Sequence, residues 1–408
     1  MAASFDFGLA IYAGSLSSSS SNWQEHCEEI GRIFILAIIT AGAAFLLLNS
    51  ASATVAGYIH GEESGVNLAE VLRGACIGLV GARMLSNVGL AALSGQARYN
   101  FLLLISLCQS LSVLVLNLRT VALGLGFVGN LKALSVLNIA WALITVCSAT
   151  YENKFLCFRR VLSFRDAGID KFLMTAKKSI SLFPSSFSSS CFANLDKIIV
   201  GASVGAQNLA FYTIASTVAS QINIVAALIS QPIIHIVPMS DTDFRAKHSL
   251  DRYARLILVV CPLLGLILIL GSPLIAVQFF PQLKNISEIL KVERAIGVMS
   301  FIYSLYSVNC YGHYYWLARK RYWFVSAVGV LSSFGALAAM FMVRGEFGLL
   351  GLVACNLVYA ISVLLTVAAI RDNDGSIKAG LFFGSIIFGA SMLFLAFRCA
   401  YSSRLGFD

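Results

Sequence analysis

A row of basic and polar side chains lies inside the apolar stretch from residue 67 to residue 94. At about 100° per helical residue, Arg73, Arg83, Asn87 and Ser94 fall within roughly 80° of one another on a single face. Arg83 is near the middle of the stretch, and ionisable groups in hydrocarbon usually face a bundle interior or a water-filled cavity. Because a guanidinium donates two hydrogen bonds to a phosphate at once, we predict that Arg83, helped by Arg73 and Asn87, binds an anionic group.

A second charged pair lies in the apolar segment NLDKIIVGASVGAQNLAFYTIAS, which starts at Asn194. Lys197 shares one helical face with Asn194, and both are predicted to contact the same substrate. The alternative for Lys197 is an ammonium group that snorkels to the membrane interface. Side chains next to each other in a helix diverge by about 100°. We therefore expect Asp196 and Lys197 not to pair.

Hydroxyl and amide side chains form a stripe along the apolar stretch from residue 207 to residue 236. Thr213, Ser216, Ser220 and Asn223 lie within about 100° of helical rotation. Such a stripe can line a hydrophilic path, which is the role that we predict. Serine and threonine also serve in ordinary packing between membrane helices, and that alternative stays open.

The elements that position these residues are membrane helices. The chain has 408 residues, of which 58% are hydrophobic and only 12% are charged, so a water-soluble domain could not bury its apolar side chains. A bilayer core requires about 20 apolar residues per helix. The sequence therefore predicts an all-α polytopic membrane protein with eleven spans, approximately at residues 33–58, 67–94, 100–118, 131–150, 179–200, 207–236, 256–280, 293–317, 322–343, 347–370 and 378–397.

The longest predicted connection divides the chain into two sets of helices. Residues 31–150 form an N-terminal lobe with four spans, residues 151–178 form a basic loop, and residues 179–408 form a C-terminal lobe with seven spans. Placing the basic loop in the cytoplasm gives that side eighteen lysine and arginine residues, against eight on the other side. This distribution predicts that residues 1–30 are a cytoplasmic segment and that the C-terminus is outside.

Common catalytic and cofactor-binding motifs do not occur in a suitable context. The GxGxxG pattern at residues 124–129 joins two membrane spans instead of following a strand, and there is no Walker A, HExxH or GxSxG motif. The ten cysteines are scattered singly, and the excess of basic residues falls between apolar runs without forming one patch. We predict no catalytic residue, no cofactor, no metal site and no nucleic-acid partner.

One part of the chain resembles a known signature. The residues Leu195-Asp196-Lys197, followed by Gly201, Gly205 and Tyr212, are similar to the "LDr..iG..lG......Y" pattern of Wzx-type polysaccharide and O-antigen flippases. The basic middle loop, Pro238 and the turn GLAALSGQARYN also fit this family, which is related to MATE exporters. Family members usually begin with a two-helix hairpin that ends in a pattern similar to Asp6-Phe7-Gly8-Leu9. Here that pattern is at the very start, so we expect the first hairpin to be missing.

The resemblance implies two pseudo-symmetric, MATE-like helical bundles that open alternately to each side of the membrane. It implies a multi-pass protein of the cell inner (cytoplasmic) membrane that flips an undecaprenyl-diphosphate-linked oligosaccharide to the outer leaflet, for O-antigen or lipopolysaccharide biosynthesis. Arg83, Arg73 and Lys197 would hold the diphosphate, and the polar stripe would contact the glycan. The energy would come from the membrane potential or from a coupling ion, H⁺ or Na⁺.

Three alternatives to this function remain at this point. A MATE-like drug/cation antiporter requires a membrane-embedded acid in the N-terminal lobe, where Glu70 is the candidate. A membrane enzyme such as an O-antigen polymerase or ligase resembles chains with a long outward loop, whereas the outward loops here are short. The third alternative is a truncated remnant that does not transport.

Overall fold

The computed structural model describes residues 28–29, 31–40, 42–43, 46, 81–95, 99–123, 126–152, 169–280, 285–343, 346–372 and 389. Within these ranges the chain forms helices joined by short turns, and no strand occurs among them. The predicted all-α fold class is confirmed. The chain divides into two compact units, Met1–Phe187 and Ser188–Asp408.

The described helices of the first unit are a short apolar helix (Gly31–Thr40), α4 (Ala82–Gly95), α5 (Tyr99–Ala122), α6 (Gly126–Glu152) and the beginning of α8 (Ile169–Ser230). Helix α4 packs closely against α6 at Gly89, where an added Cβ would lie 3.1 Å from the backbone of Thr145. Helices α5 and α6 are joined by a hydrogen bond of 2.8 Å from Trp141 Nε1 to Ser112 Oγ. A small residue and a polar contact thus hold helices together where apolar burial alone offers no advantage over lipid.

Helix α8 contains a sharp break at Gly205. The backbone there has φ 84° and ψ 171°, a conformation essentially restricted to glycine, and it separates two helical segments. The break lies between the predicted spans 179–200 and 207–236, as the sequence indicates. Helix α8 begins at Ile169, so its first turns lie within the residues 151–178 that the sequence assigns to the basic loop. Asp170 in its first turn is favourable at a helix N-terminus.

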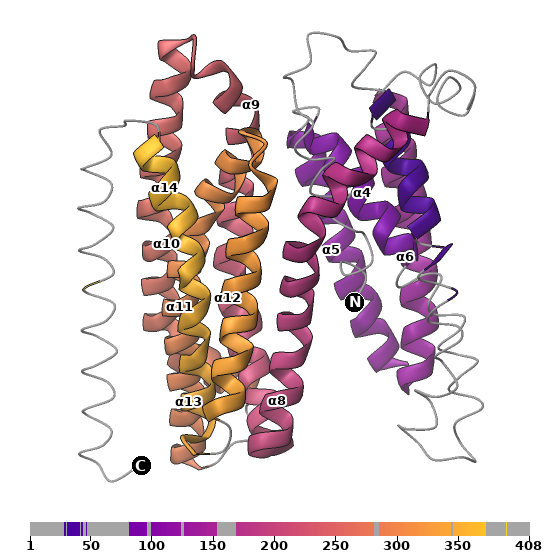
Figure 1. The fold of residues 1–408 in the computed structure, drawn as a ribbon. Coiled ribbons are helices and arrows are strands. Elements are labelled where there is room, and N and C mark those ends of the chain that lie inside the picture. The colour runs from indigo at the N-terminus through magenta and orange to yellow at the C-terminus, as the bar shows by residue number, and fades with distance from the viewer. Residues whose placement is uncertain are drawn as a thin grey trace. The chain divides into compact units, whose positions relative to one another are not determined.

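The second unit contains the rest of α8 and a bundle that follows it in the chain (Figure 1). Its elements are α9 (Ile233–Ile236), η3 (Val237–Met239), α10 (Phe244–Phe279), α11 (Ile286–Ala318), α12 (Tyr322–Val343), α13 (Gly348–Cys355), the 3₁₀ helix η4 (Asn356–Val363) and α14 (Leu364–Asp372). One apolar core joins the second half of α8 to α11, α12 and α13, with members that include Phe211, Tyr212, Ile296, Met340 and Leu352.

Helices α11 and α14 cross with almost no space between their backbones. A Cβ on Gly312 would lie 2.2 Å from the carbonyl carbon of Leu365, so only glycine fits there. The Thr366 hydroxyl accepts a hydrogen bond from Gly312 N–H (3.0 Å) and donates one to the Val308 carbonyl (2.8 Å). It therefore contacts both backbone groups that one i to i−4 bond of α11 would join.

Five stretches among the described residues are long and apolar enough to cross a membrane: Lys132–Ala149, Asp170–Met239, Phe244–Phe279, Tyr322–Val343 and Gly348–Asp372. They agree in position with predicted spans, and Asp170–Met239 contains two of these on either side of Gly205. Most of the predicted spans 33–58 and 378–397 lies outside the described residues.

Candidate functional site

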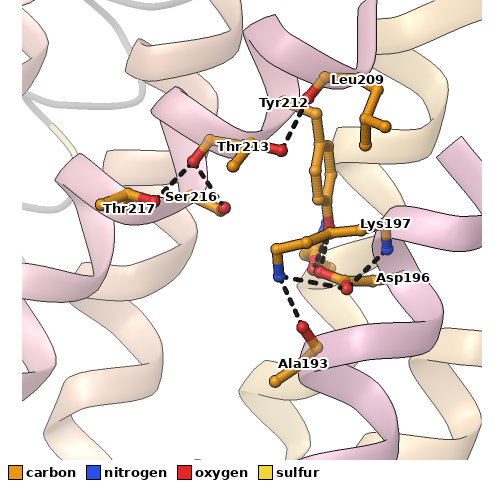
Figure 2. A network of polar contacts seen from close by, with 9 residues as sticks. Ala193, Asp196, Lys197, Leu209, Tyr212, Thr213, Ser216 and Thr217 are labelled. Carbon is orange, nitrogen blue, oxygen red and sulfur yellow. Dashed lines mark hydrogen bonds and ion pairs between the residues drawn. The ribbon is translucent and has the colours of Figure 1, made fainter. Parts of the chain in front are cut away.

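The charged pair of the signature segment belongs to a buried polar network (Figure 2). Asp196 is only 3% exposed. Its Oδ1 accepts hydrogen bonds from the backbone N–H of Lys197 (2.6 Å) and from Lys197 Nζ (3.4 Å), and its Oδ2 accepts one from the Tyr212 hydroxyl (3.0 Å). A buried carboxylate is tolerated only with such partners, because it has lost its hydration.

The glycines of the signature place this network. Asp196 lies before the break at Gly205 and Tyr212 lies after it, so the chain reverses between them and brings the two side chains together. At Gly201 an added Cβ would lie 3.1 Å from Leu209 Cδ2, which shows how closely the two arms of the hairpin approach. Asp196, Gly201, Gly205 and Tyr212 of the signature therefore belong to one structural unit.

A fourth residue, distant in sequence, completes the network of Asp196, Lys197 and Tyr212. Asn356 is 2% exposed and lies at the junction of α13 and η4. Its Nδ2 is 3.3 Å from the Tyr212 hydroxyl oxygen and donates to the carbonyls of Leu352 (3.3 Å) and Val353 (3.0 Å). Asn356 is not among the residues predicted from the sequence. The available signal was a single amide side chain within the apolar run from residue 347 to residue 370.

The expectation that Asp196 and Lys197 do not pair is wrong. Lys197 Nζ lies 3.4 Å from Asp196 Oδ1 and donates a hydrogen bond of 2.5 Å to the carbonyl of Ala193. The Cα–Cβ bonds of Asp196 and Lys197 do point in directions about 100° apart. The long lysine side chain nevertheless folds back over the preceding turn and reaches the carboxylate. The Lys197 side chain remains 37% exposed, so its ammonium group is still accessible.

The predicted polar stripe lies on the second arm of α8, and its hydroxyls bond to the helix itself. Thr213 Oγ1 donates to the Leu209 carbonyl (2.8 Å), and Ser220 Oγ donates to the Thr217 carbonyl (2.8 Å). Buried Ser216 donates to the Thr213 carbonyl (3.1 Å). Asn223 points elsewhere: its Oδ1 accepts a contact of 3.3 Å from the Cys310 thiol on α11.

The remaining predicted binding residues are distributed over both units. Arg83 and Asn87 are half-buried on α4 in the first unit, one helical turn apart. Asn194 is exposed on α8, on the same arm as Lys197 in the second unit. Arg73, like the alternative acid Glu70, lies outside the described residues. The structure thus brings together Arg83 with Asn87, and Asn194 with Lys197.

The matching family model covers residues 19–288 and is described as polysaccharide biosynthesis protein. The chain belongs to this polysaccharide biosynthesis family. Among curated proteins no significant match occurs. The Asp196–Tyr212 hairpin, which carries the signature, falls within the matched residues.

Solved structures similar to this polysaccharide biosynthesis protein are MATE transporters and a relative in the same superfamily. An outward-facing multidrug resistance MATE family transporter of the MOP superfamily is 15% identical, with a TM-score of 0.62, over 96% of this chain and 85% of that one. The Vibrio cholerae MATE transporter VcmN in the bent form is 13% identical, with a TM-score of 0.58, over 94% and 84% of the two chains.

A MOP superfamily transporter from Pyrococcus furiosus is 14% identical, with a TM-score of 0.61, over 96% of this chain and 86% of that one. At these identities the likeness establishes the MATE-like fold alone. Together with the family, it identifies a multi-pass membrane transporter and points away from an enzyme.

A second charged cluster of this transporter lies at helix ends. The Arg319 guanidinium binds the Asp241 carboxylate through two hydrogen bonds of 2.6 and 2.8 Å, and its Nε lies 3.9 Å from Asp372 Oδ2. Tyr315 donates a hydrogen bond of 2.6 Å to the same Asp372 oxygen. The hydrogen bonds from Arg319 hold the pKa of Asp241 below its usual value, and those to Asp241 raise the pKa of Arg319 further.

The described residues contain no group of three or more histidine, cysteine, aspartate or glutamate side chains that could hold a metal ion. Their polar groups inside apolar helices are a cation and an amide on α4, a cation and an amide on α8, and the hydroxyls of the second α8 arm. Such groups can bind an anion and contact hydroxyl-rich molecules, but they supply no activated nucleophile.

Proposed function

We propose that this transporter flips a lipid-linked oligosaccharide, carried on undecaprenyl diphosphate, from the cytoplasmic to the outer leaflet of the inner membrane. The observation that carries the proposal is the presence of cationic side chains within apolar helices of a polysaccharide biosynthesis family member. Arg83 is half-buried on α4, and Lys197 keeps an accessible ammonium group on α8. Intramembrane cations of this kind are costly and mark sites that bind anions.

Each unit carries side chains that we assign to the diphosphate. In the first, Arg83 supplies a bidentate donor, with Asn87 on the same face and Arg73 assigned to the same role. In the second, Lys197 and Asn194 supply an ammonium and an amide. A related transporter of this fold is described as having a binding pocket of reverse polarity that suggests a different function. A cationic site in place of an acidic one is in keeping with that precedent.

The glycan would pass the hydroxyl stripe of the second α8 arm. Thr213, Ser216 and Ser220 each donate their proton to a carbonyl of their own helix. Their oxygens keep lone pairs free to accept hydrogen bonds, and a hydroxyl has two acceptor positions. A sugar is rich in hydroxyl donors, so an acceptor-only stripe matches many sugars without selecting one. The lipid tail would remain in the bilayer.

A second candidate function is cation-coupled antiport of a drug, favoured by the MATE-like fold. If the protein is a flippase, the membrane potential or a coupling ion, H⁺ or Na⁺, would supply the energy. Its N-terminus would lie in the cytoplasm. The two functions differ in their response to a charge change at Arg83. A flippase needs that cation for its anionic substrate, whereas a carrier of cationic drugs does not.

The test is complementation of a flippase-deleted strain with Arg83→Ala, Arg83→Glu and Arg83→Lys. We expect glycan export to be lost with alanine and glutamate and to be partly retained with lysine, at equal protein levels in the membrane. The matched control is Lys171→Ala, which removes an exposed cation at the start of α8 and should export like the wild type. Wild-type export by Arg83→Glu would overturn the assigned diphosphate site, and drug resistance without any glycan export would favour the antiporter.

A further inference from the structure

Helix α10 is longer than the hydrocarbon core of a membrane. Its 36 residues extend about 54 Å at about 1.5 Å per residue, against a core of about 30 Å. Leu256–Phe279 contains no charged residue and accounts for about 36 Å, so this part spans the core. The preceding turns, Phe244–Arg255, therefore begin at the lipid head groups, and at about 18 Å they also extend beyond a head-group layer of about 5–8 Å.

The two long faces of α10 have different environments. One face packs into the unit through buried residues that include Leu250, Ala254, Ile257 and Cys261. The opposite face is a strip of aliphatic side chains, each more than 40% exposed and together within roughly 80° of helical rotation: Leu256, Leu263, Ile267, Leu270, Leu274 and Val277. In a membrane protein an exposed aliphatic strip of this length contacts lipid chains.

Two arginines continue this strip into the head-group region. Arg245 and Arg252 are exposed and lie seven residues apart, about 20° from each other, in line with Leu256 and Leu263. Neither guanidinium forms an ion pair within the described ranges. The nearby acid Asp243 caps the helix through a hydrogen bond of 2.8 Å to the backbone N–H of Arg245.

We infer that this face of α10 binds an anionic phospholipid. Its phosphate would lie between Arg245 and Arg252, and an acyl chain would follow Leu256, Leu263 and Ile267. The two arginines are about 10 Å apart along the axis, so their long side chains can converge on one head group from both sides. Each guanidinium can donate two hydrogen bonds to phosphate oxygens. A zwitterionic lipid offers the same phosphate but adds a cationic amine next to these arginines.

This inference goes beyond the general excess of positive charge at cytoplasmic helix ends. A topology signal depends on how many basic residues a segment carries, whereas a binding face depends on where they are and on their hydrogen-bonding geometry. The two explanations therefore separate when charge is removed from different positions, or when arginine is replaced by lysine at the same position.

The experiment uses the purified full-length protein and counts lipids retained in native mass spectrometry with phosphatidylglycerol or phosphatidylcholine. We expect the protein to retain phosphatidylglycerol in preference to phosphatidylcholine. Each arginine should contribute about fivefold to this binding, so R245Q/R252Q should bind phosphatidylglycerol about 25-fold more weakly than the wild type. R245K/R252K keeps the charge and should give an intermediate loss. The control K171Q/K177Q removes the same charge from exposed positions on α8 and should bind like the wild type.

Equal weakening in R245Q/R252Q and K171Q/K177Q would overturn the inference, because bulk charge would then explain the binding. Equal retention of the two lipids would overturn it as well. Undecaprenyl phosphate as a competitor distinguishes the source of the phosphate. If undecaprenyl phosphate displaces phosphatidylglycerol only when it is in large excess, the face is a phospholipid site. If it displaces phosphatidylglycerol at equal concentration, the face binds the carrier lipid instead. All four substituted positions are exposed, and thermal unfolding in detergent checks that the variants fold.

Discussion

The two acid–base clusters of the second unit use similar groups in opposite surroundings. In the hairpin network, Asp196 is 3% exposed and its side-chain partners are Lys197 and Tyr212 of the same helix α8. In the helix-end cluster, the Asp241 side chain is 58% exposed, and Arg319 binds it at 2.6 and 2.8 Å, whereas the side-chain donors of Asp196 lie at 3.0 and 3.4 Å. Short distances therefore do not rank the two clusters by stability. Burial does, because a carboxylate without water depends on its protein partners, whereas an exposed carboxylate can exchange them for water.

The largest difference is expected on removing each carboxylate. Asp196→Ala removes the acceptor that the Lys197 ammonium and the buried Tyr212 hydroxyl share, which leaves them the Ala193 carbonyl and a longer contact to Asn356 Oδ1. We expect a loss of about 2–4 kcal/mol of unfolding free energy. The range lies below that of a fully buried pair because the Lys197 side chain is 37% exposed. Thermal and denaturant unfolding in detergent measures it. Asp241→Ala is the matched control, and an equal loss in both variants would refute the comparison.

A smaller effect is expected when the hairpin is disturbed without touching a charge. Gly205→Ala places a Cβ where φ is 84° and ψ is 171°, which costs about 1–3 kcal/mol. The control is Gly271→Ala in the middle of α10, where a Cβ meets only Ile275 at 3.9 Å and helix propensity improves. Unfolding of both variants is compared by the same assay. Gly205→Ala that is as stable as the wild type would show that the network does not need this backbone turn.

The smallest effect is expected in the exposed cluster. Asp241→Asn should cost no more than about 1 kcal/mol, and this loss should shrink in high salt. Arg319 lowers the pKa of Asp241 in the folded protein. The contribution of this ion pair to the unfolding free energy is therefore complete above the ordinary aspartate pKa, and it is lost as the pH falls toward the lowered value. Measuring the unfolding free energies of wild type and Asp241→Asn across this acidic range tests whether the difference between them becomes smaller as the pH falls. A difference that grows on acidification would contradict it.

The sequence was sufficient for the fold class because apolar length and the spacing of basic loops depend only on the bilayer. The signature residues were also found, since Asp196 and Tyr212 lie close in sequence. Asn356 was not, because its contact with Tyr212 depends on the packing of helices 144 residues apart. The error on Lys197 has another cause: helical rotation predicts where a Cβ points, but a long side chain can bend back from that direction.

The roles of the predicted binding residues remain predictions. Helical periodicity correctly grouped Arg83 with Asn87 on one helix, but it could not indicate that Thr213, Ser216 and Ser220 use their protons within the helix. Hydroxyls in an apolar helix satisfy themselves on nearby carbonyls, and a stripe on a helical wheel does not show this. The further difference at Asn223, which contacts Cys310, again depends on a neighbouring helix.

The hairpin network also constrains the order in which the chain can mature. Asp196 and Tyr212 can meet as soon as the α8 hairpin leaves the translocation machinery, but Asn356 is synthesised 144 residues after Tyr212. At about 5–20 residues per second this delay lasts roughly 7–30 s. During that interval the Tyr212 hydroxyl has Asp196 but not its amide partner. Insertion of the last described span would thus act as a checkpoint that completes the unit.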